Sequence, residues 1–370
     1  MVSRLLSALD ARIAKCHGLL EADCLRAERA ALLARQGRLG EAHAALAAIR
    51  ARYDRHPNAA ISAWANLAEG LAALYKDLGP LARDKMRRAL ALATAADAQR
   101  VRVLSAAWLA SFAYADDDWD AMVAHLDIAL AASESDSRLA LARACLVVAQ
   151  AYHWCDRFDL ALPWYVRARR YAMDEGDETI LSALMHNMAW LRAFQARRLA
   201  ASGNADRKQV LEVLLGTEST AQFDRVVSTK SLQSLVPMLR AHVLALLDRH
   251  AEALTLFDTH FDAAMAEGLG NIRFSLLAEM AWCRARLGDA PGARRDALAA
   301  EGQLEAFKLV DDSATHGRLA QVFAALDDAA AAERHQALAV RDRQLHAERQ
   351  AQGLERLSNL AAIRGARRAN

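Results

Sequence analysis

The stretch "DRFDLALPWYVRA", residues 156–168, decides the fold of this chain of 370 residues. It opens with an aspartate, and Phe158, Ala161, Tyr165 and Ala168 follow at offsets of three, four and three. Those offsets place all four side chains on one face of an α-helix. The stretch therefore predicts a turn followed by a helix that packs through alternating small and bulky residues.

The same pattern returns along most of the chain. "DDWDAMVAHLDIAL" (residues 117–130) and "DRHAEALTLFDTH" (248–260) repeat it, and its central position recurs at 42, 82, 122, 161, 253, 293 and 332. The steps are 39 or 40 residues, apart from one of 92 between 161 and 253. A fixed period of this size predicts a solenoid of helical hairpins. The long step fits two repeats plus about 12 extra residues, so we expect about eight hairpins with an irregular unit at about 177–227.

Each repeat also contains a first helix and a turn. A small residue stands twelve positions before the central one in seven repeats: Ala30, Gly70, Ala110, Ala149, Ala241, Ala281 and Ala320. Small side chains let two helices of a hairpin approach closely. Between the helices stand residues suited to turns or caps: Gly37, Asp77, Asp117, Asp156, Asp248, Gly288 and Asp327. The sequence thus predicts an all-α fold.

The repeat resembles the tetratricopeptide repeat (TPR) family over about residues 20–340. The resemblance rests on sets such as Ala161/Tyr165/Ala168 and Ala82/Met86/Ala89, and on Gly70 at the usual glycine position. The chain departs from the family in its period of about 40 residues, in the alanines that replace most of the glycines, and in the missing proline, where Met173 stands. The resemblance implies a right-handed α-solenoid whose concave groove binds a protein or peptide.

The long period is similar to that of the TPR-like sensor regions of maltose-type regulators and of diguanylate cyclases that carry a GGDEF domain. Residues 311–350 resemble the last repeat and exit helix of the cyclases. No GGDEF-like sequence and no helix-turn-helix domain follows within the 370 residues. Two functions stay open: an interaction module in bacterial signalling or regulation, and the sensory half of a cyclase-type protein.

We expect the repeat array over residues 1–326 and a C-terminal segment over residues 327–370. From Ala329 to about Ala362 the only glycine is Gly353 and there is no proline, which predicts one long helix. Its weak heptad allows a homodimer. From Arg341 to Asn370 seven arginines face three acids. This basic end is open to RNA, lipid or an acidic partner, but we favour a solvated helix that frays.

Composition excludes several classes of protein. The net charge of +2 gives no general attraction to nucleic acid or membranes. No apolar run is long enough to span a membrane, and no signal peptide opens the chain, so we expect a cytoplasmic protein. The five cysteines never show CxxC spacing, which favours reduced, buried thiols.

Motifs of catalysis are absent from the sequence. It contains no GxxxxGK[ST], no HExxH, no GxSxG and no zinc-ligand spacing of Cys and His. Asp116, Asp117 and Asp118 fit helix capping better than cation binding. His153, Trp154 and Cys155 are consecutive on a helix and point about 100° apart, so they do not converge on one substrate. We expect no enzyme, no cofactor and no metal.

By the TPR resemblance, the groove is lined by set positions of the first helices. The candidate residues among them combine aromatic area with polar edges, as binding sites often do. They are Trp64, Tyr114, Gln150, His153, His186, Trp190, His242 and Trp282. Two interpretations stay open: either these side chains bind a protein or peptide partner, or a tight superhelix packs them against one another.

Overall fold

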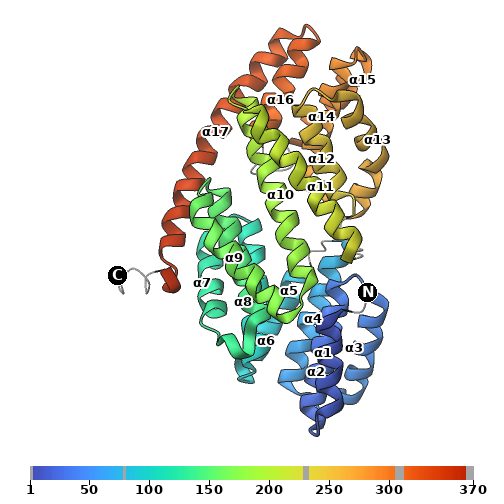
Figure 1. Ribbon diagram of the computed structural model, residues 1–370, viewed down its shortest axis with the longest axis vertical. Helices are drawn as coiled ribbons and strands as arrows, with labels where there is room; N and C mark the ends of the chain where they lie inside the picture. The colour runs from blue at the N-terminus through green and yellow to red at the C-terminus, as the bar shows by residue number, and fades with distance from the viewer. Residues whose placement is uncertain (1–2, 78–80, 228–232, 305–311, 364–370) are drawn as a thin grey trace. The chain divides into compact units, whose positions relative to one another are not determined.

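The chain folds into helices throughout the residues that the computed structural model describes, which are 3–77, 81–227, 233–304 and 312–363 (Figure 1). The elements are α1 (Arg4–Lys15), α2 (Leu19–Arg35), α3 (Leu39–Tyr53), α4 (Ala59–Asp77), α5 (Leu81–Ala95), α6 (Gln99–Ala115), α7 (Trp119–Leu130), α8 (Glu134–Trp154), α9 (Phe158–Glu175), α10 (Glu178–Ala201), α11 (Arg207–Val227), α12 (Leu235–Leu246), α13 (His250–Ala266), the 3₁₀ helix η1 (Leu269–Ile272), α14 (Arg273–Arg286), α15 (Ala290–Leu304), α16 (Asp312–Ala325) and α17 (Ala329–Ser358). After α1, the α-helices form eight successive pairs, α2/α3 to α16/α17. The predicted all-α array of about eight hairpins is confirmed.

The repeat pattern marks the core. Five of the six alanines that precede the central position by twelve residues, Ala30, Ala110, Ala149, Ala241 and Ala281, are completely buried. The central residues Ala42, Ala82, Met122, Ala161, Ala253 and Ala293 are completely buried as well. In the last pair Ala332 is only half-buried, and no further hairpin follows it among the described residues to cover it.

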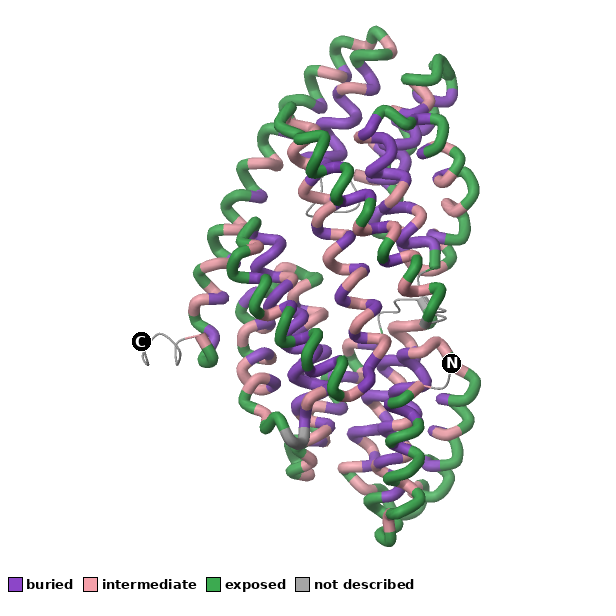
Figure 2. The backbone as a smooth tube through the Cα atoms, in the orientation of Figure 1, coloured by how far each residue is buried: buried purple, intermediate pink, exposed green. Residues whose placement is uncertain are grey.

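First helices make one continuous layer in the described residues of each part of the chain. α2 packs on α4, α4 on α6 and α6 on α8; α12 packs on α14 and α14 on α16. Second helices pack on their own first helix and on the next one, as α5 does with α4 and α6. As a consequence, the first helices are the most buried part of the array. Figure 2 shows buried residues along them, while α3 and α13 expose their outer faces.

Turns within the hairpins share one geometry. Gly37, Asp117, Asp156, Asp248, Gly288 and Asp327 all have positive φ, and the turn after Asp77 lies outside the described residues. The amide that follows each of these six residues bonds to a carbonyl five positions earlier, as Arg157 N does to Tyr152 O at 2.9 Å. This is the Schellman ending of a helix, which requires a left-handed residue.

The irregular unit is a pair of long helices. α10 has 24 residues and α11 has 21, and only residues 202–206 separate them. The extra residues expected near 177–227 therefore extend helices that pack through Val210, Val213 and Leu214 onto α12 and its neighbours. A loop insertion is not needed to explain the step of 92.

Contacts divide the chain into two compact units. Unit 1 comprises residues 1–184, 227–231 and 351–370, and unit 2 comprises residues 185–226 and 232–350.

The end of α17 belongs to unit 1 and is not a solvated tail. Leu357 and Leu360 are completely buried. Trp119 and Cys155 lie so close to Gly353 that a side chain there would overlap the indole ring. Arg356 pairs with Asp120 at 2.9 Å, and Ala361 N donates to Asp127 Oδ1 at 2.9 Å. The expectation of a fraying helix is wrong as far as residue 361, because apolar contacts that the sequence does not reveal hold it. Residues 364–370 lie outside the described residues.

None of the described helices has the length and apolar character that a membrane span requires.

Candidate partner-binding site

The first helices of each unit are called its inner layer, and that of unit 2 contains two partly exposed tryptophans. Trp190 on α10 packs against Phe194, one turn away, with ring centroids 4.4 Å apart. Trp282 on α14 lies under two cations, since the guanidinium carbons of Arg318 and Arg286 are 5.1 Å and 5.4 Å from its ring centroid. Aromatic surface with cations over its face combines apolar area with charge, which suits recognition of a partner.

A buried ion cluster supports this layer. Arg197 Nε and Arg318 Nε lie 3.3 Å and 3.0 Å from the carboxylate of Glu279, and all three side chains are buried. Burial alone would raise the pKa of Glu279, but the Arg318 and Arg197 guanidinium groups lower it to about 2. The glutamate is therefore charged at neutral pH, and it fixes two arginines from α10 and α16 on α14.

Two predicted histidines of unit 2 are buried. His242 on α12 packs edge-on against Phe257, and burial, helped by Arg197, lowers its pKa to about 3. His186 on α10 contacts Asp224 of α11 at 2.5 Å. Both side chains join helices of the unit, which is a structural role.

Of the four predicted residues of unit 1, two are buried and two are half-buried. Trp64 on α4 is buried, and so is His153 on α8, whose Nδ1 lies 3.0 Å from the Tyr165 hydroxyl. Tyr114 on α6 is half-buried and meets Trp119 edge-on at 6.3 Å. Gln150 is half-buried as well.

Of the eight predicted residues, four are thus buried packing residues and four keep exposed surface in their own unit. Trp64, His153, His186 and His242 form the first group, and Tyr114, Gln150, Trp190 and Trp282 form the second. Binding at any of them stays a prediction. Self-packing therefore describes the first group, and partner binding by the second group stays a prediction.

His153 and Trp154, which precede Cys155, pack against other aromatic residues. His153 packs between Phe158 and Tyr165, while Trp154 turns to Trp119 with ring centroids 5.4 Å apart. Burial raises the pKa of Cys155 to about 12, so the thiolate is not formed near neutral pH. Burial also raises the pKa of the Cys145 thiol and that of the Cys283 thiol to about 12. These thiols are unsuited to nucleophilic catalysis.

The aspartate run behaves as a cap. Asp118 accepts a hydrogen bond from Ala121 N at 3.0 Å at the start of α7, and Asp117 is the left-handed turn residue. Among the described residues no group of three or more His, Cys, Asp or Glu side chains has the arrangement of a metal site.

Sequence reasoning missed the arginines of the inner layer in unit 1. Arg35 on α2 donates to both carboxylate oxygens of Asp177 at 2.8 Å and 2.9 Å, and both side chains are buried. Arg100 on α6 donates to the carboxylate of Glu28 on α2 through both Nε and Nη2. The partners are 142 and 72 residues apart, so no local signal in the sequence connects them.

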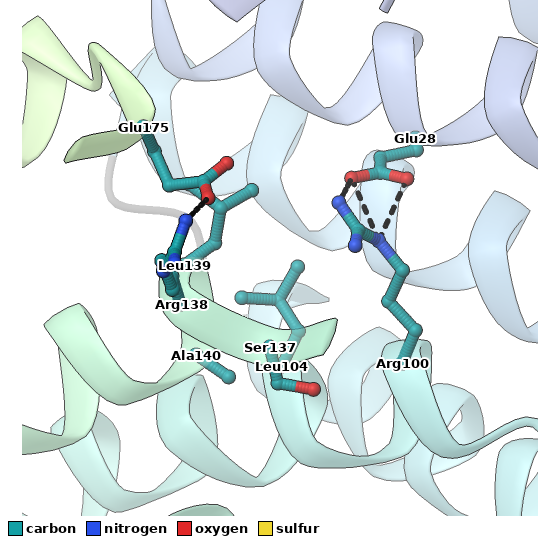
Figure 3. A pocket seen from close by; sticks show the side chains of 8 residues that line it. All are labelled: Glu28, Arg100, Leu104, Ser137, Arg138, Leu139, Ala140 and Glu175. Atoms are coloured by element: carbon teal, nitrogen blue, oxygen red, sulfur yellow. Dashed lines mark hydrogen bonds and ion pairs between the residues drawn. The ribbon is translucent and has the colours of Figure 1, made fainter. Parts of the chain in front are cut away.

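A pocket opens beside these ion pairs (Figure 3). It is small, with about 20 Å³ of free space, and is formed by α2, α6, α8 and α9. Its lining residues are Glu28, Arg100, Leu104, Ser137, Arg138, Leu139, Ala140 and Glu175. At Ser137 the backbone leaves helical geometry, with φ −141° and ψ 29°, which kinks α8 at the pocket. None of these residues belongs to the predicted set.

Comparison with known proteins identifies the fold. No family model matches the chain, and no curated protein matches it in sequence. Among solved structures, the chain is similar to a Rap protein, described as the crystal structure of Rap protein complexed with competence and sporulation factor. The TM-score is 0.60 at 11% sequence identity, and the match covers 89% of this chain and 99% of that chain. The TPR-like helical repeat fold is therefore shown, whereas kinship to cyclase-linked sensor regions stays a prediction.

Proposed function

We propose that this chain is a non-enzymatic interaction module that binds a peptide segment or a helix of a protein partner on its first-helix faces. The carrying observation is the inner layer of unit 2, where Trp190 and Trp282 keep exposed surface and Arg318, which the buried Glu279 holds in place, lies over the Trp282 ring. Rigid aromatic rings lose little entropy on binding and bury large areas.

The likeness to the Rap protein supports this proposal. That protein has the same kind of helical array over almost its whole length, and it was solved in complex with a factor. We extend the proposal to a role in signalling or regulation on the same ground. The raised pKa values of the buried cysteines, and the use of Asp118 as a cap, favour binding over catalysis.

The test is a selection from a random-peptide display library on the full chain. Trp190→Ala/Trp282→Ala is compared with wild type after its helicity has been verified by circular dichroism. Trp164→Ala is the matched control, because this half-buried tryptophan lies on the second helix α9 with Arg167 over its ring. Peptides recovered by wild type are then synthesised with a fluorescent label and titrated by anisotropy.

We expect the double variant to bind these peptides at least about tenfold more weakly, since each truncated aromatic anchor removes on the order of 1–2 kcal/mol. Trp164→Ala should bind like wild type. A library that yields no binding peptide would reject the proposal, and equal binding by the double variant would move the site away from the inner layer of unit 2.

A further inference from the structure

Two buried histidines join the last two helices of unit 2. His316 on α16 and His335 on α17 lie with their Nδ1 atoms 2.8 Å apart, and both side chains are buried. The His335 ring also stacks on Phe323 of α16, with centroids 5.4 Å apart and planes 8° apart. A distance of 2.8 Å is that of a hydrogen bond, so one Nδ1 carries the shared hydrogen and the other accepts it.

Two acids and two arginines face the pair: Glu301 on α15, and Asp342, Arg334 and Arg341 on α17. Glu301 Oε1 lies 3.4 Å from His335 Nε2. Asp342 Oδ2 lies 3.8 Å from His316 Nε2, and both distances are long for a hydrogen bond. Each acid contacts one of the arginines more closely, at 2.6 Å and 2.8 Å. The acids therefore favour a charged imidazole only weakly.

The packed pair does not accept a proton on each ring. If both imidazoles were charged, each Nδ1 would carry a hydrogen, and two positive N–H groups would face each other across 2.8 Å. Burial opposes even the first charge, because it is the largest effect on both rings and lowers their pKa, that of His316 to about 4. The pair therefore stays neutral at pH values at which an exposed histidine is protonated.

These rings carry much of the packing of the first part of α17. Between residues 329 and 350 the buried side chains are Ala331, His335, Ala339 and His346. Val340 and Leu345, the bulkier apolar residues of this part, are each 44% exposed. Apolar burial by two alanines is small, so packing of this part depends on histidines that remain neutral.

We infer that the His316–His335 pair is an acid-sensitive contact, which holds residues 329–350 of α17 on α15 and α16 at neutral pH and releases them in mildly acidic solution. A released histidine recovers its ordinary pKa of 6.5. Below that pH the released state binds more protons than the packed state, so packing is complete above pH 6.5 and weakens as the pH falls.

The test is hydrogen exchange of the full chain, measured by mass spectrometry at pH 7.5 and pH 5.5 and corrected for the intrinsic exchange rate at each pH. Peptides from residues 329–350 are compared with peptides from residues 351–360, which contain no histidine and serve as the internal control.

Three variants of verified helicity accompany wild type. His316→Gln/His335→Gln puts two amides in place of the rings, which still form hydrogen bonds but do not titrate. His316→Gln alone keeps one titrating ring and decides the question if the double variant does not fold. His43→Gln is the matched control, because His43 is exposed on α3.

We expect the protection of residues 329–350 to fall about a hundredfold from pH 7.5 to pH 5.5 in wild type and in His43→Gln, since each of two rings contributes about tenfold over this interval. The fall should be about tenfold in His316→Gln and less than about twofold in the double variant. Protection of residues 351–360 should change less than about twofold in all four proteins.

Three results would overturn the inference. Unchanged protection of residues 329–350 in wild type would show that the packed pair accepts protons freely. An equal fall in wild type and in the double variant, or in His316→Gln if the double variant does not fold, would assign the effect to another group. A fall of the same size in residues 351–360 would show a general loosening rather than release of the first part of α17.

Discussion

His242 shows what burial does to a titratable residue in this fold. Its side chain is buried in unit 2, and its Nδ1 has no hydrogen-bond partner among the described residues. Burial and the nearby Arg197 lower its pKa to about 3, from an ordinary value of 6.5. The folded protein therefore keeps His242 neutral while the unfolded chain takes up a proton below pH 6.5.

This difference makes stability depend on pH. Between pH 6.5 and pH 3 the unfolded state binds more protons, so the free energy of unfolding rises with pH. From pH 8 to pH 5 the loss through His242 amounts to about 2 kcal/mol. Glu279, whose pKa is lowered to about 2, contributes stability that is lost only below pH 4.5, outside this interval.

We therefore expect His242→Leu to lose about 2 kcal/mol less than wild type between pH 8 and pH 5. Urea unfolding followed by tryptophan fluorescence at both pH values measures this difference. The difference is independent of how the substitution changes stability at pH 8. Equal losses in the two proteins would show that His242 titrates normally in the folded state.

At the scale of the helix pair, the glycine of the second repeat shows why a small residue stands twelve positions before the central one. A β-carbon built at Gly70 on α4 would lie 3.0 Å from the carbonyl oxygen of Ala82 and 3.0 Å from Met86 Cγ, both on α5. The neighbour is helix backbone, which cannot rotate away. By contrast, a β-carbon at Gly216 in α11 would have no atom within 4 Å.

The two glycines therefore predict opposite effects of the same substitution. Gly70→Ala should lower the free energy of unfolding by about 1 kcal/mol or more, because overpacking forces α4 and α5 apart. Gly216→Ala should raise it by about 0.5–1 kcal/mol through helix propensity alone. Thermal melting of both variants beside wild type checks the pair. If Gly70→Ala instead stabilised the protein, α4 and α5 would have to lie farther apart in solution than they do in the structure.

At the scale of the whole molecule, the chain does not divide in sequence order. Unit 1 is completed by residues 351–370, although unit 2 occupies most of the second half of the chain. The end of α17 and the residues just after it supply Leu357 and Leu360 to unit 1, where both are completely buried, and Gly353 on α17 lies against Trp119. Stability of unit 1 thus depends on residues far away in sequence.

Leu357→Ala should accordingly destabilise unit 1 by about 2–4 kcal/mol, as the loss of a large buried side chain usually does. Hydrogen exchange measured by mass spectrometry should become faster in α7 and α8, while peptides of α13 and α14 keep their rates. The control is Leu345→Ala on the same helix, where the leucine is 44% exposed and the cost should stay within about 0.5 kcal/mol. Faster exchange in both units to the same degree would contradict the division.

Sequence by itself determined the repeat. The offsets around Phe158, the interval of about 40 residues and the left-handed turn residues such as Asp156 are local features, and backbone geometry and helix periodicity translate them directly into hairpins. The same reasoning placed all eight candidate residues on helices, where they lie in the structure. It did not tell Trp282, which keeps exposed surface, from His242, which does not.

Only the tertiary structure decided which side chains meet. Arg100 and Glu28, Arg35 and Asp177, and Leu357 and its neighbours come together through the stacking of many hairpins, and their separation in sequence leaves no periodic trace. Burial and charge balance depend on those meetings. The pocket at Arg138 and the docking of the last helix therefore belong to the packed molecule, whereas the hairpins belong to the sequence.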